Sequence, residues 1–555
     1  MSKRFSVAAE QSAFSRFSYY VLGSDIQVTA FTTLWLVLQA LVFGLGLVNY
    51  RYNAIYQQSR ELLGWSLVFA RASALVIHVD TAVILFPVCR TLVSMLRSTP
   101  LSRVIPFDRN LGFHKLCGYS LVAFTIIHTA SHYANYAKLA QNNGPDGPGF
   151  AFYCFVSGPG LTGHIMLLSL ILMTVTAQGR IRQRSFEAFW YTHHLFIVFF
   201  AGFTIHGGFC LVKPDSGDCA NMASFWKYWI ASGVVYLAER TMREVRARHK
   251  TMITKVVQHP SNTVEIQIRK DFCHAKAGQY IFVCCPEISL HQWHPFTLTS
   301  APEEQCLSIH MRTVGNWTRQ FAERLGCELV GPPGGPRDPR KILAEQHGLD
   351  RAHVVTALSP SRPTFAHTLP QIVVDGPFGC ASEDVFNYEV AFLVGAGIGV
   401  TPFASVLKSI WYRANSPSQH TRLRKVYFFW IARDKECFEW FQSLLKAIEN
   451  EDANHYIEIR TYLTGRLNTD EVRNVMLNDE EGHEDALTGL KSPTYYGRPN
   501  WDQVFLQLRE NHPATDIGVF FCGPQRLDNV LHMMCRQSND PSEAGTKFFY
   551  NKENF

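Results

Sequence analysis

Four histidines near the ends of two apolar segments are the residues best suited to chemistry in this chain. His114 and His128 lie in one segment, and His193 and His206 lie in the other. Histidine is costly in apolar surroundings unless it is paired or bound to a metal. This arrangement predicts two metal centres held between two helices, and neutral imidazole is a common axial ligand of haem iron. The chain has no CxxC motif, so we expect any haem to be b-type and non-covalently bound.

The spacing of these histidines defines one pair of positions better than the other. His114 and His128 are 14 residues apart, nearly four helical turns, so both rings point the same way. His206 follows His193 by 13 residues and His194 by 12, or about 3.6 and 3.3 turns, which leaves both open as ligands. A bend or bulge near Gly202 could restore the register. The alternative interpretation is that all of them are interior histidines satisfied by neighbouring side chains.

The first 240 residues hold the long apolar segments, which predict six membrane spans of about 20 residues each. The predicted spans are 29–49, 63–85, 113–134, 163–179, 187–207 and 224–239. The connections on one side carry 16 Lys and Arg residues and the opposite ones only 4, which places both termini in the cytoplasm. His114 and His193 then lie towards the cytoplasm, and His128 and His206 towards the outside. In the last outward loop, Cys210 and Cys219 are expected to form a disulfide.

Short alternating strands follow from about residue 250 and predict an antiparallel barrel. An aromatic side chain beside hydroxyl groups can stack on a flavin and hydrogen-bond to it, and an Arg near a helix start can hold a pyrophosphate. A plain β-barrel is the alternative. The residues that carry this flavin prediction are His294, Pro295, Phe296, Thr297, Thr299, Arg312, Trp317 and Thr318. Residues 332–372 are Pro-rich and charged, and we expect a mobile surface loop there.

From about residue 386, strands alternate with helices, which predicts a parallel sheet. A buried strand over 389–394 leads into a glycine-rich turn and then a helix over 403–412. Glycines at this place let a phosphate approach the helix N-terminus. The predicted phosphate-binding residues are Gly395, Gly397, Gly399, Thr401 and Pro402.

Several motifs along almost the whole chain together resemble one family. They are Pro87-Val88-Cys89-Arg90, Asp108-Arg109-Asn110-Leu111, Phe113-His114-Lys115, Phe189-Trp190-Tyr191-Thr192-His193-His194, His294-Pro295-Phe296-Thr297-Leu298-Thr299-Ser300, Asp375-Gly376-Pro377-Phe378-Gly379, Tyr496-Gly497-Arg498-Pro499-Asn500-Trp501 and Phe549-Tyr550-Asn551-Lys552-Glu553-Asn554-Phe555. The chain resembles the catalytic subunits of the phagocyte-type NADPH oxidase family, within the ferric-reductase-like superfamily. The 332–372 insertion and the absence of an outward glycosylation sequon favour the fungal oxidase A branch.

The resemblance implies three domains with distinct cofactors. It implies a six-helix transmembrane bis-haem bundle over 1–245, an antiparallel β-barrel FAD domain over 246–385, and an α/β NADPH-binding domain of the ferredoxin-reductase-like type over 386–555. It implies His114 and His193 on the inner haem and His128 and His206 on the outer haem, which selects His193 over His194.

The resemblance also implies contacts to the nucleotides. Arg433 and Arg498 lie where the family reads the 2′-phosphate of NADPH, for which the forked guanidinium is well suited. Cys522, Gly523 and Pro524 end a strand of the same domain. The aromatic Phe555 can stack on the flavin until nicotinamide displaces it.

The activity implied is transfer of electrons from cytosolic NADPH through FAD and two haems to O₂ outside, giving superoxide. Arg71, within the second span, and His132, four residues beyond His128, would form the oxygen site. Implied partners are a small membrane partner subunit, a cytosolic activator with tetratricopeptide repeats and a Rac-type GTPase. The net charge of +6 is mild, and the sequence contains no basic patch that would indicate nucleic-acid binding.

Two other functions compete with this one. A transmembrane ferric or cupric metalloreductase would use the same electron path, but such reductases tend to keep the 14-residue histidine spacing in both helices. The other alternative is a haem scaffold or ion channel without enzymatic activity, which the flavin and nucleotide motifs disfavour.

Overall fold

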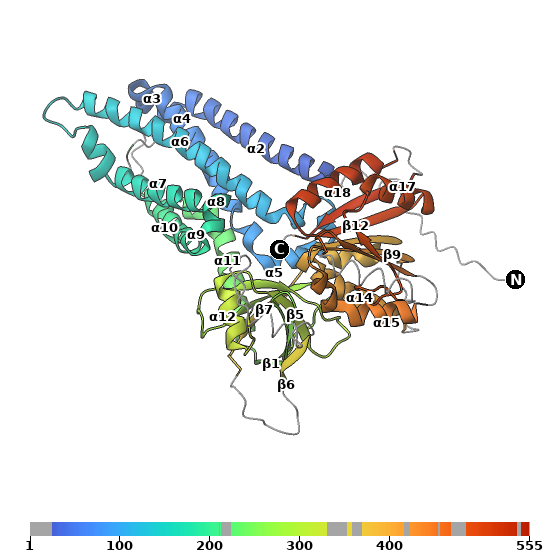
Figure 1. Cartoon of the computed structure of the whole chain (residues 1–555). Coiled ribbons are helices and arrows are strands. Elements are labelled where there is room, and N and C mark those ends of the chain that lie inside the picture. The colour runs from blue at the N-terminus through green and yellow to red at the C-terminus, as the bar shows by residue number, and fades with distance from the viewer. Residues whose placement is uncertain are drawn as a thin grey trace. The chain divides into compact units, whose positions relative to one another are not determined.

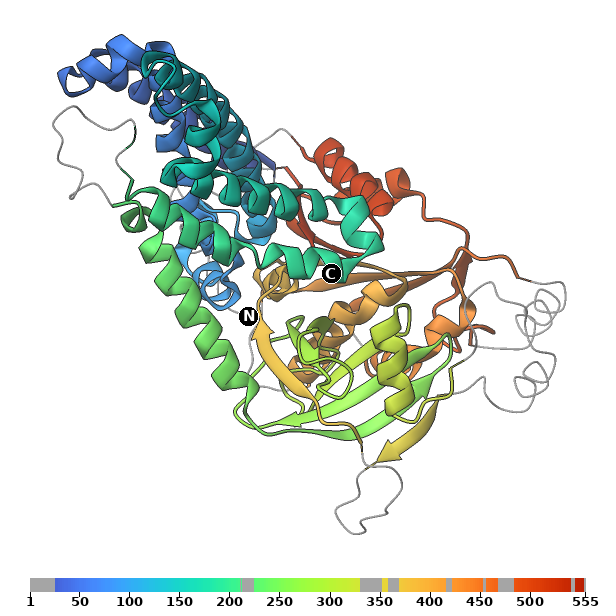
Figure 2. The ribbon, with the colours of Figure 1, turned by 90° about the vertical axis from the view of Figure 1, so that its left-hand side faces the viewer.

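The structure, a computed structural model, describes residues 25–209, 211, 224–329, 352–357, 369–415, 422–452, 456–467, 484–540 and 545–553. These residues form two compact units, which divide after Thr241. The first, called here the helical unit, contains only helices, and the second, called the nucleotide unit, contains sheets with helices packed on them (Figures 1 and 2).

The predicted membrane segments all form helices. The helices of this part are α2 (Asp25–Tyr52), α3 (Gln57–Leu63), α4 (Trp65–Val83), α5 (Arg90–Arg97), α6 (Asn110–Asn142), α7 (Gly158–Thr176), α8 (Gly179–Arg184), α9 (Phe186–His193), α10 (Phe196–His206) and α11 (Trp226–Ala247). Among the described residues, four segments are long and apolar enough to cross a membrane: 27–52, 65–88, 158–176 and 186–206. Helices α6 and α11 are more polar, and in α6 the polarity comes from its histidines and hydroxyl side chains.

Helices α2, α4 and α6 run side by side in the helical unit (Figure 1). A Cβ atom on Gly46 of α2 would lie 3.1 Å from the Ala72 backbone of α4, so a small residue permits the close approach of these helices. Gln39, Asp80 and Ser120 form a buried polar contact among the same three helices. The Gln39 amide donates to Asp80 Oδ1 over 2.7 Å, and Ser120 Oγ donates to Gln39 Oε1 over 3.2 Å. Because an unpaired polar group is costly away from water, this contact fixes the rotation of the three helices.

The nucleotide unit begins with two antiparallel sheets. Its first strands are β1 (Thr251–His259), β2 (Thr263–Lys270), β3 (Tyr280–Cys284), β4 (His294–Thr297), β5 (Leu307–Arg312), β6 (His353–Ala357) and β7 (Val373–Phe378), and helix α12 spans Asn316–Arg324. The sheet orders are β5-β2-β1-β6 and β4-β3-β7, and an isolated bridge between Leu298 and Ile309 connects them. Val264, Ile266 and Ile268 alternate along β2 into the hydrophobic core, which explains why this sequence forms a half-buried strand.

The prediction of a loop throughout 332–372 is wrong for one segment. Strand β6 lies inside that range and pairs antiparallel with β1, with His353 opposite Gln258 and Thr356 opposite Val256. The β-branched run Val354-Val355-Thr356 favours a strand, but the surrounding prolines and charges concealed it. The Pro-rich head of the insertion, 332–336, lies outside the described residues.

The predicted parallel sheet is confirmed. Its strands are β8 (Val390–Ala396), β9 (Lys425–Ala432), β10 (Ile457–Leu463), β11 (Thr494–Tyr496), β12 (Asp516–Cys522) and β13 (Lys547–Lys552). They run in the order β11-β10-β9-β8-β12-β13, and every adjacent pair is parallel. The helices between them are α14 (Thr401–Ala414), α15 (Gln442–Glu451), α17 (Trp501–Asn511) and α18 (Gln525–Ser538). The central strands are buried on both faces, as their continuous apolar sequences require.

A buried carboxylate pairs with two arginines inside the nucleotide unit, which includes the end of α11 from Met242 onward. Asp375 of β7 is only 1% exposed. Its Oδ2 accepts a hydrogen bond from Arg243 Nε over 2.6 Å, and its Oδ1 accepts one from Arg246 Nη2 over 3.3 Å. Both guanidinium groups also lie over the ring of Phe378.

Replacing this carboxylate is expected to destabilise the nucleotide unit. Asp375→Asn removes the charge that both arginines pair with, and we expect the free energy of unfolding to fall by about 2 kcal/mol. Urea unfolding of the full chain in detergent, followed by tryptophan fluorescence, measures the change. The control is Glu244→Gln, because its pair with Arg248 is exposed to solvent and its loss should cost less than about 0.5 kcal/mol. Equal effects of the two substitutions would show that the Asp375 pairs do not stabilise the fold.

Candidate functional site

The first histidine pair joins α6 to the end of α9. The ring centroids of His114 and His193 are 6.1 Å apart, with an angle of 61° between the ring planes. His114 Nδ1 lies 2.9 Å from the carbonyl oxygen of Ile84, which only accepts, so Nδ1–H is the donor. In the neutral ring, Nε2 therefore carries a lone pair. His193 Nδ1 is buried and has no hydrogen-bond partner among the described residues.

The second histidine pair joins α6 to α10. The ring centroids of His128 and His206 are 6.4 Å apart. His128 Nδ1 donates to the carbonyl oxygen of Ala70 over 2.9 Å. His206 Nδ1 lies 2.9 Å from Thr162 Oγ1, whose own proton is donated to the Gly158 carbonyl. In each ring, Nδ1 makes the orienting contact, and the opposite nitrogen, Nε2, faces the other histidine of the pair.

A break between two helices sets the register of the second histidine-bearing segment. Helix α9 ends at His193 and α10 begins at Phe196, so His194 and Leu195 form a turn. The break does not lie near Gly202, where the sequence suggested it, because Gly202 lies inside α10, against Met166. The structure pairs His193 with His114, whereas His194 is exposed and its Nδ1 lies 2.7 Å from the Trp190 carbonyl oxygen. The turn at 194–195 brings the rings of His193 and His206 to face α6.

The two pairs have the geometry of bis-imidazole metal sites. Two imidazoles that bind one metal ion through Nε2, each at about 2 Å, place their ring centroids about 6 Å apart. Both observed separations match this distance. A hydrogen bond at Nδ1 is also the usual second contact of a histidine that binds a metal. The residues present therefore fit two haem irons, each held by one histidine from α6 and one from the 186–206 segment.

A cavity lies beside the second pair. Its walls include Arg71, His78, His128, His132 and His206. The Arg71 guanidinium lies 5.8 Å from the centroid of the Tyr56 ring. The ring of His132 is 4.6 Å from that of His128, and its Nδ1 is buried without a hydrogen-bond partner among the described residues. The structure thus brings the predicted Arg71 and His132 to one cavity with the second pair.

Two groups of functional residues were not predicted from the sequence: the oxygen atoms that orient the histidines, and the other histidines of the cavity. Thr162, Ala70 and Ile84 come from other helices, and no spacing within one segment points to them. His78 lines the cavity and stacks on Tyr228, with ring centroids 4.0 Å apart. A histidine within an apolar segment was the available signal for His78, since His78 lies in predicted span 63–85.

The predicted flavin residues gather around β4. His294 stacks on Trp317 with ring centroids 4.1 Å apart, and Phe296 lies 6.2 Å from the same indole. Trp317 is 6% exposed and packs in the core, so it supports His294 and Phe296 from inside. Burial lowers the pKa of His294 to about 4, so its imidazole is neutral at physiological pH.

The hydroxyl and cationic residues of this set differ in accessibility. The Thr299 side chain is fully buried, and its Oγ1 lies 2.9 Å from both Ser308 Oγ and His310 Nδ1. Thr297 is buried next to Phe296, and Pro295 is exposed. Arg312 ends β5 partly exposed, 3.8 Å from Asp434 Oδ2. Thr318 Oγ1 accepts from Gly315 N over 3.0 Å and caps α12, so the helix start stands just after Arg312.

The predicted nucleotide residues meet at the carboxyl edge of the parallel sheet. Gly397 has φ +58, a conformation that favours glycine. A Cβ atom on Gly399 would lie 2.4 Å from the Cys522 carbonyl oxygen, so only glycine brings this turn onto the end of β12. Gly523 and Pro524 continue from that end into α18, and Gly395, Thr401 and Pro402 flank the turn on β8 and α14. A backbone so close to a strand end and a helix start suits a bound phosphate.

Arg433 and Arg498 lie further along the carboxyl edge of the parallel sheet. Arg433 follows β9 and Arg498 follows β11, and both side chains are exposed. Strands β9 and β11 flank β10, so both arginines lie on the side of β8 opposite to β12. Phe555, Cys210 and Cys219 lie outside the described residues.

Three known protein families match successive parts of the chain. Residues 80–204 match the family described as the ferric reductase like transmembrane component. Residues 248–382 match an FAD-binding domain, and residues 388–536 match the ferric reductase NAD binding domain. The chain therefore has a ferric-reductase-like transmembrane region followed by FAD-binding and NAD-binding domains.

Relatives match over nearly the full length. A superoxide-generating NADPH oxidase heavy chain from Dictyostelium discoideum is 39% identical over 508 residues, which cover 89% of this chain and 91% of the relative. NADPH oxidase 1 of Mus musculus is 37% identical, with 95% of this chain and 93% of the relative covered. NADPH oxidase 3 of Homo sapiens is 35% identical, with 91% and 94% covered. With similarity of this extent, the chain belongs to the NADPH oxidase family.

Proposed function

We propose that this chain is a superoxide-generating NADPH oxidase that carries electrons from NADPH to O₂ across a membrane. The observation that carries the proposal is the presence of two histidine pairs, each with a centroid separation suited to one iron, in a chain that also has flavin- and nucleotide-binding folds. In the overall reaction, one NADPH and two O₂ give NADP⁺, one H⁺ and two superoxide anions.

The cofactors of the proposal are FAD and two b-type haems. His114 and His193 would hold one haem, and His128 and His206 the other. When bound, FAD and the haems supply carriers that take up a hydride and pass on single electrons. The Nδ1 hydrogen bonds to Ile84, Ala70 and Thr162 hold three of the four rings and leave Nε2 as the atom that would bind the iron.

The residues of the nucleotide unit would select and orient the two nucleotides. Phe296 and Thr297 would meet the flavin ring, and Arg312 with the start of α12 would hold its pyrophosphate. The Gly395–Pro402 turn would receive the NADPH pyrophosphate. Arg433 and Arg498, both exposed beyond the strand ends, would pair with the 2′-phosphate.

Orientation and partners complete the proposal. We place all six predicted spans in the membrane with both termini in the cytoplasm, because Lys and Arg are concentrated 16 to 4 on that side. In this orientation the second histidine pair and its cavity lie towards the outside, where oxygen is reduced. The partners proposed from the family resemblance are a small membrane partner protein, a tetratricopeptide-repeat activator and a Rac-type GTPase.

The four paired histidines should each be required for haem binding. We expect His114→Ala, His128→Ala, His193→Ala and His206→Ala to remove the bis-imidazole haem spectrum of the affected site and to lower electron flux by more than about 100-fold. His194→Ala is the matched control, since its ring is exposed and bonds to its own helix. Reduced-minus-oxidised haem spectra and pyridine haemochrome content measure the loss. Normal spectra for His193→Ala together with haem loss in His194→Ala would reverse the assignment.

Arg498 should discriminate between the two coenzymes. A charge-assisted hydrogen bond to the 2′-phosphate is lost in Arg498→Ala, so we expect the KM for NADPH to rise about 10- to 100-fold while the KM for NADH changes less than about twofold. Steady-state kinetics with both coenzymes provide the measurement. Arg509→Ala, an exposed arginine on α17, serves as the control. A parallel rise in both KM values would mean that Arg498 does not contact the 2′-phosphate.

Residues of the cavity beside the second histidine pair should determine which molecule accepts the electrons. The Arg71 cation can stabilise a developing superoxide anion, with His132 as a polar or proton-donating neighbour. We expect Arg71→Ser and His132→Leu to retain both haems and their reduction by NADPH but to lose superoxide output by about 10-fold or more. The measurement is dismutase-sensitive reporter reduction by protein with its activators. A wild-type protein that reduces ferric chelates rapidly without air, and makes no superoxide in air, would instead be a metalloreductase.

A further inference from the structure

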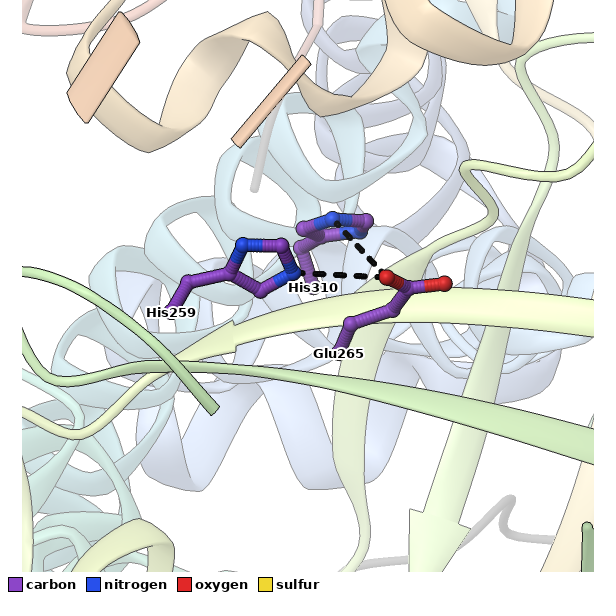
Figure 3. Close-up of side chains that lie close together, drawn as sticks. All are labelled: His259, Glu265 and His310. Carbon is purple, nitrogen blue, oxygen red and sulfur yellow. Dashed lines mark hydrogen bonds and ion pairs between the residues drawn. The ribbon is translucent and has the colours of Figure 1, made fainter. Parts of the chain in front are cut away.

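Three strands bring two histidines and a glutamate together on one face of the β5-β2-β1-β6 sheet. Glu265 of β2 pairs in register with His310 of β5, and His259 of β1 lies opposite Thr263. Because side chains alternate along a strand, Thr263, Glu265 and Gln267 share the face opposite to the core residues of β2. Figure 3 shows both imidazoles directed at the Glu265 carboxylate.

The distances in this group are close to those of a metal site. His259 Nε2 lies 3.3 Å from Glu265 Oε2, and His310 Nε2 lies 4.0 Å from the same oxygen. One ligand atom from each residue lies within 4.8 Å of the other two. A tetrahedral zinc ion with bonds of about 2.0–2.1 Å separates its ligands by about 3.3 Å. The first distance already has this value, and the others need small side-chain rotations.

The surroundings orient two of the three ligand residues, His310 and Glu265, as a metal site requires. His310 Nδ1 lies 2.9 Å from Thr299 Oγ1, and Gln267 Nε2 donates to Glu265 Oε1 over 2.9 Å. These contacts occupy His310 Nδ1 and Glu265 Oε1. His310 Nε2 and Glu265 Oε2 therefore point towards the centre of the group. Outer hydrogen bonds of this kind fix the ligands of bound metals.

Buried polar atoms without partners point to something bound. His310 is 7% exposed and its Nε2 has no hydrogen bond among the described residues. Thr263, which is fully buried opposite His259, also has an unpartnered Oγ1 within the described part of the chain. Leaving such atoms unpaired costs free energy, and a cation bound by the lone pair of Nε2 removes part of this cost. In the tautomer whose Nδ1–H donates to Thr299 Oγ1, this lone pair would otherwise face a carboxylate oxygen 4.0 Å away.

We propose that His259, Glu265 and His310 form a binding site for a divalent transition-metal ion, with zinc as the best match. Two imidazoles and one carboxylate are a frequent zinc ligand set, which leaves a fourth position for water or for Thr263 Oγ1. The net charge of the bound set is +1. The site shares no residue with the haem, flavin and nucleotide sets assigned above, and it adjoins the predicted flavin residues where His310 contacts Thr299.

The ion would lie where a neighbouring segment covers this face. The ring of Phe441, in the 3₁₀ segment η9 (Lys435–Phe441), is 4.5 Å from that of His310. Trp440 Nε1 donates to the Pro260 carbonyl next to His259, over 3.3 Å. A metal bound here therefore holds β1, β2 and β5 in the position against which η9 packs. Its role is structural, and it takes part in no electron transfer.

Zinc binding to the cofactor-loaded full chain in detergent tests the site. The protein is treated with EDTA, dialysed and titrated with ZnCl₂, and bound zinc per chain is determined by mass spectrometry. We expect one tightly bound zinc. Zinc-edge X-ray absorption, which does not detect iron, should show two imidazoles and about two further nitrogen or oxygen ligands at about 2.0–2.2 Å. Absence of tight zinc, or a zinc spectrum without two imidazoles, overturns the proposal.

Variants assign the zinc to these residues. His310→Gln and Glu265→Gln should weaken zinc binding by more than about 100-fold, beyond the loss of an outer contact alone. His353→Gln, an exposed histidine on β6 of the same sheet, should leave it unchanged. His310→Cys should keep zinc and add one sulfur ligand at about 2.3 Å, a gain that a merely misfolded variant does not give. Unchanged zinc binding in His310→Gln, or no sulfur in zinc-loaded His310→Cys, refutes the assignment.

Discussion

An imidazole can face a partner across a helix bundle only if its other nitrogen is held. In the helical unit, the Nδ1 atoms of His114, His128 and His206 each contact an oxygen from another helix. These contacts set which nitrogen carries the proton and which way each ring points. They also depend on the rotation of α4 relative to α6, because Ala70 and Ile84 are α4 residues or follow it directly. The buried contact among Gln39, Asp80 and Ser120 fixes that same rotation. The orientation of the histidine pairs, and with it their ability to bind a metal, therefore depends on the packing of polar groups between the helices.

Where a single helix carries both ligands, the sequence was sufficient. The 14-residue spacing of His114 and His128 places both on one face of α6, and the structure has them there. The second segment could not be predicted in this way, because a two-residue turn at His194 and Leu195 interrupts it. Neither residue is a strong helix breaker, so no local signal marks the turn. The family resemblance selected His193, and the structure explains the choice through a break at a different place from the one expected.

The nucleotide unit shows the same contrast between local and distant determinants. Alternating strands, the glycine turn and the strand–helix order predicted the two kinds of sheet, since each is a property of consecutive residues. The roles of Trp317 and Thr299 were less accessible to sequence reasoning. An indole next to a flavin motif can meet either the cofactor or the core, and Trp317 packs in the core behind His294. Thr299 has its hydroxyl between Ser308 and His310, partners that only strand pairing brings near. Strand β6 was missed because its pairing with β1 outweighs the composition around it.

Strand register also explains why the His259, Glu265 and His310 group was not visible in the sequence. Helical spacing of 14 residues relates two ligands within one segment, but His259, Glu265 and His310 lie on three strands separated by up to 51 positions. The alternation along β2 shows that Glu265 faces away from the core, but it does not show what lies opposite. Only the register, with Glu265 against His310 and His259 against Thr263, brings the polar atoms together. A one-residue shift of either pairing would turn one ligand to the core face, so the group depends on the same strand order that builds the flavin domain.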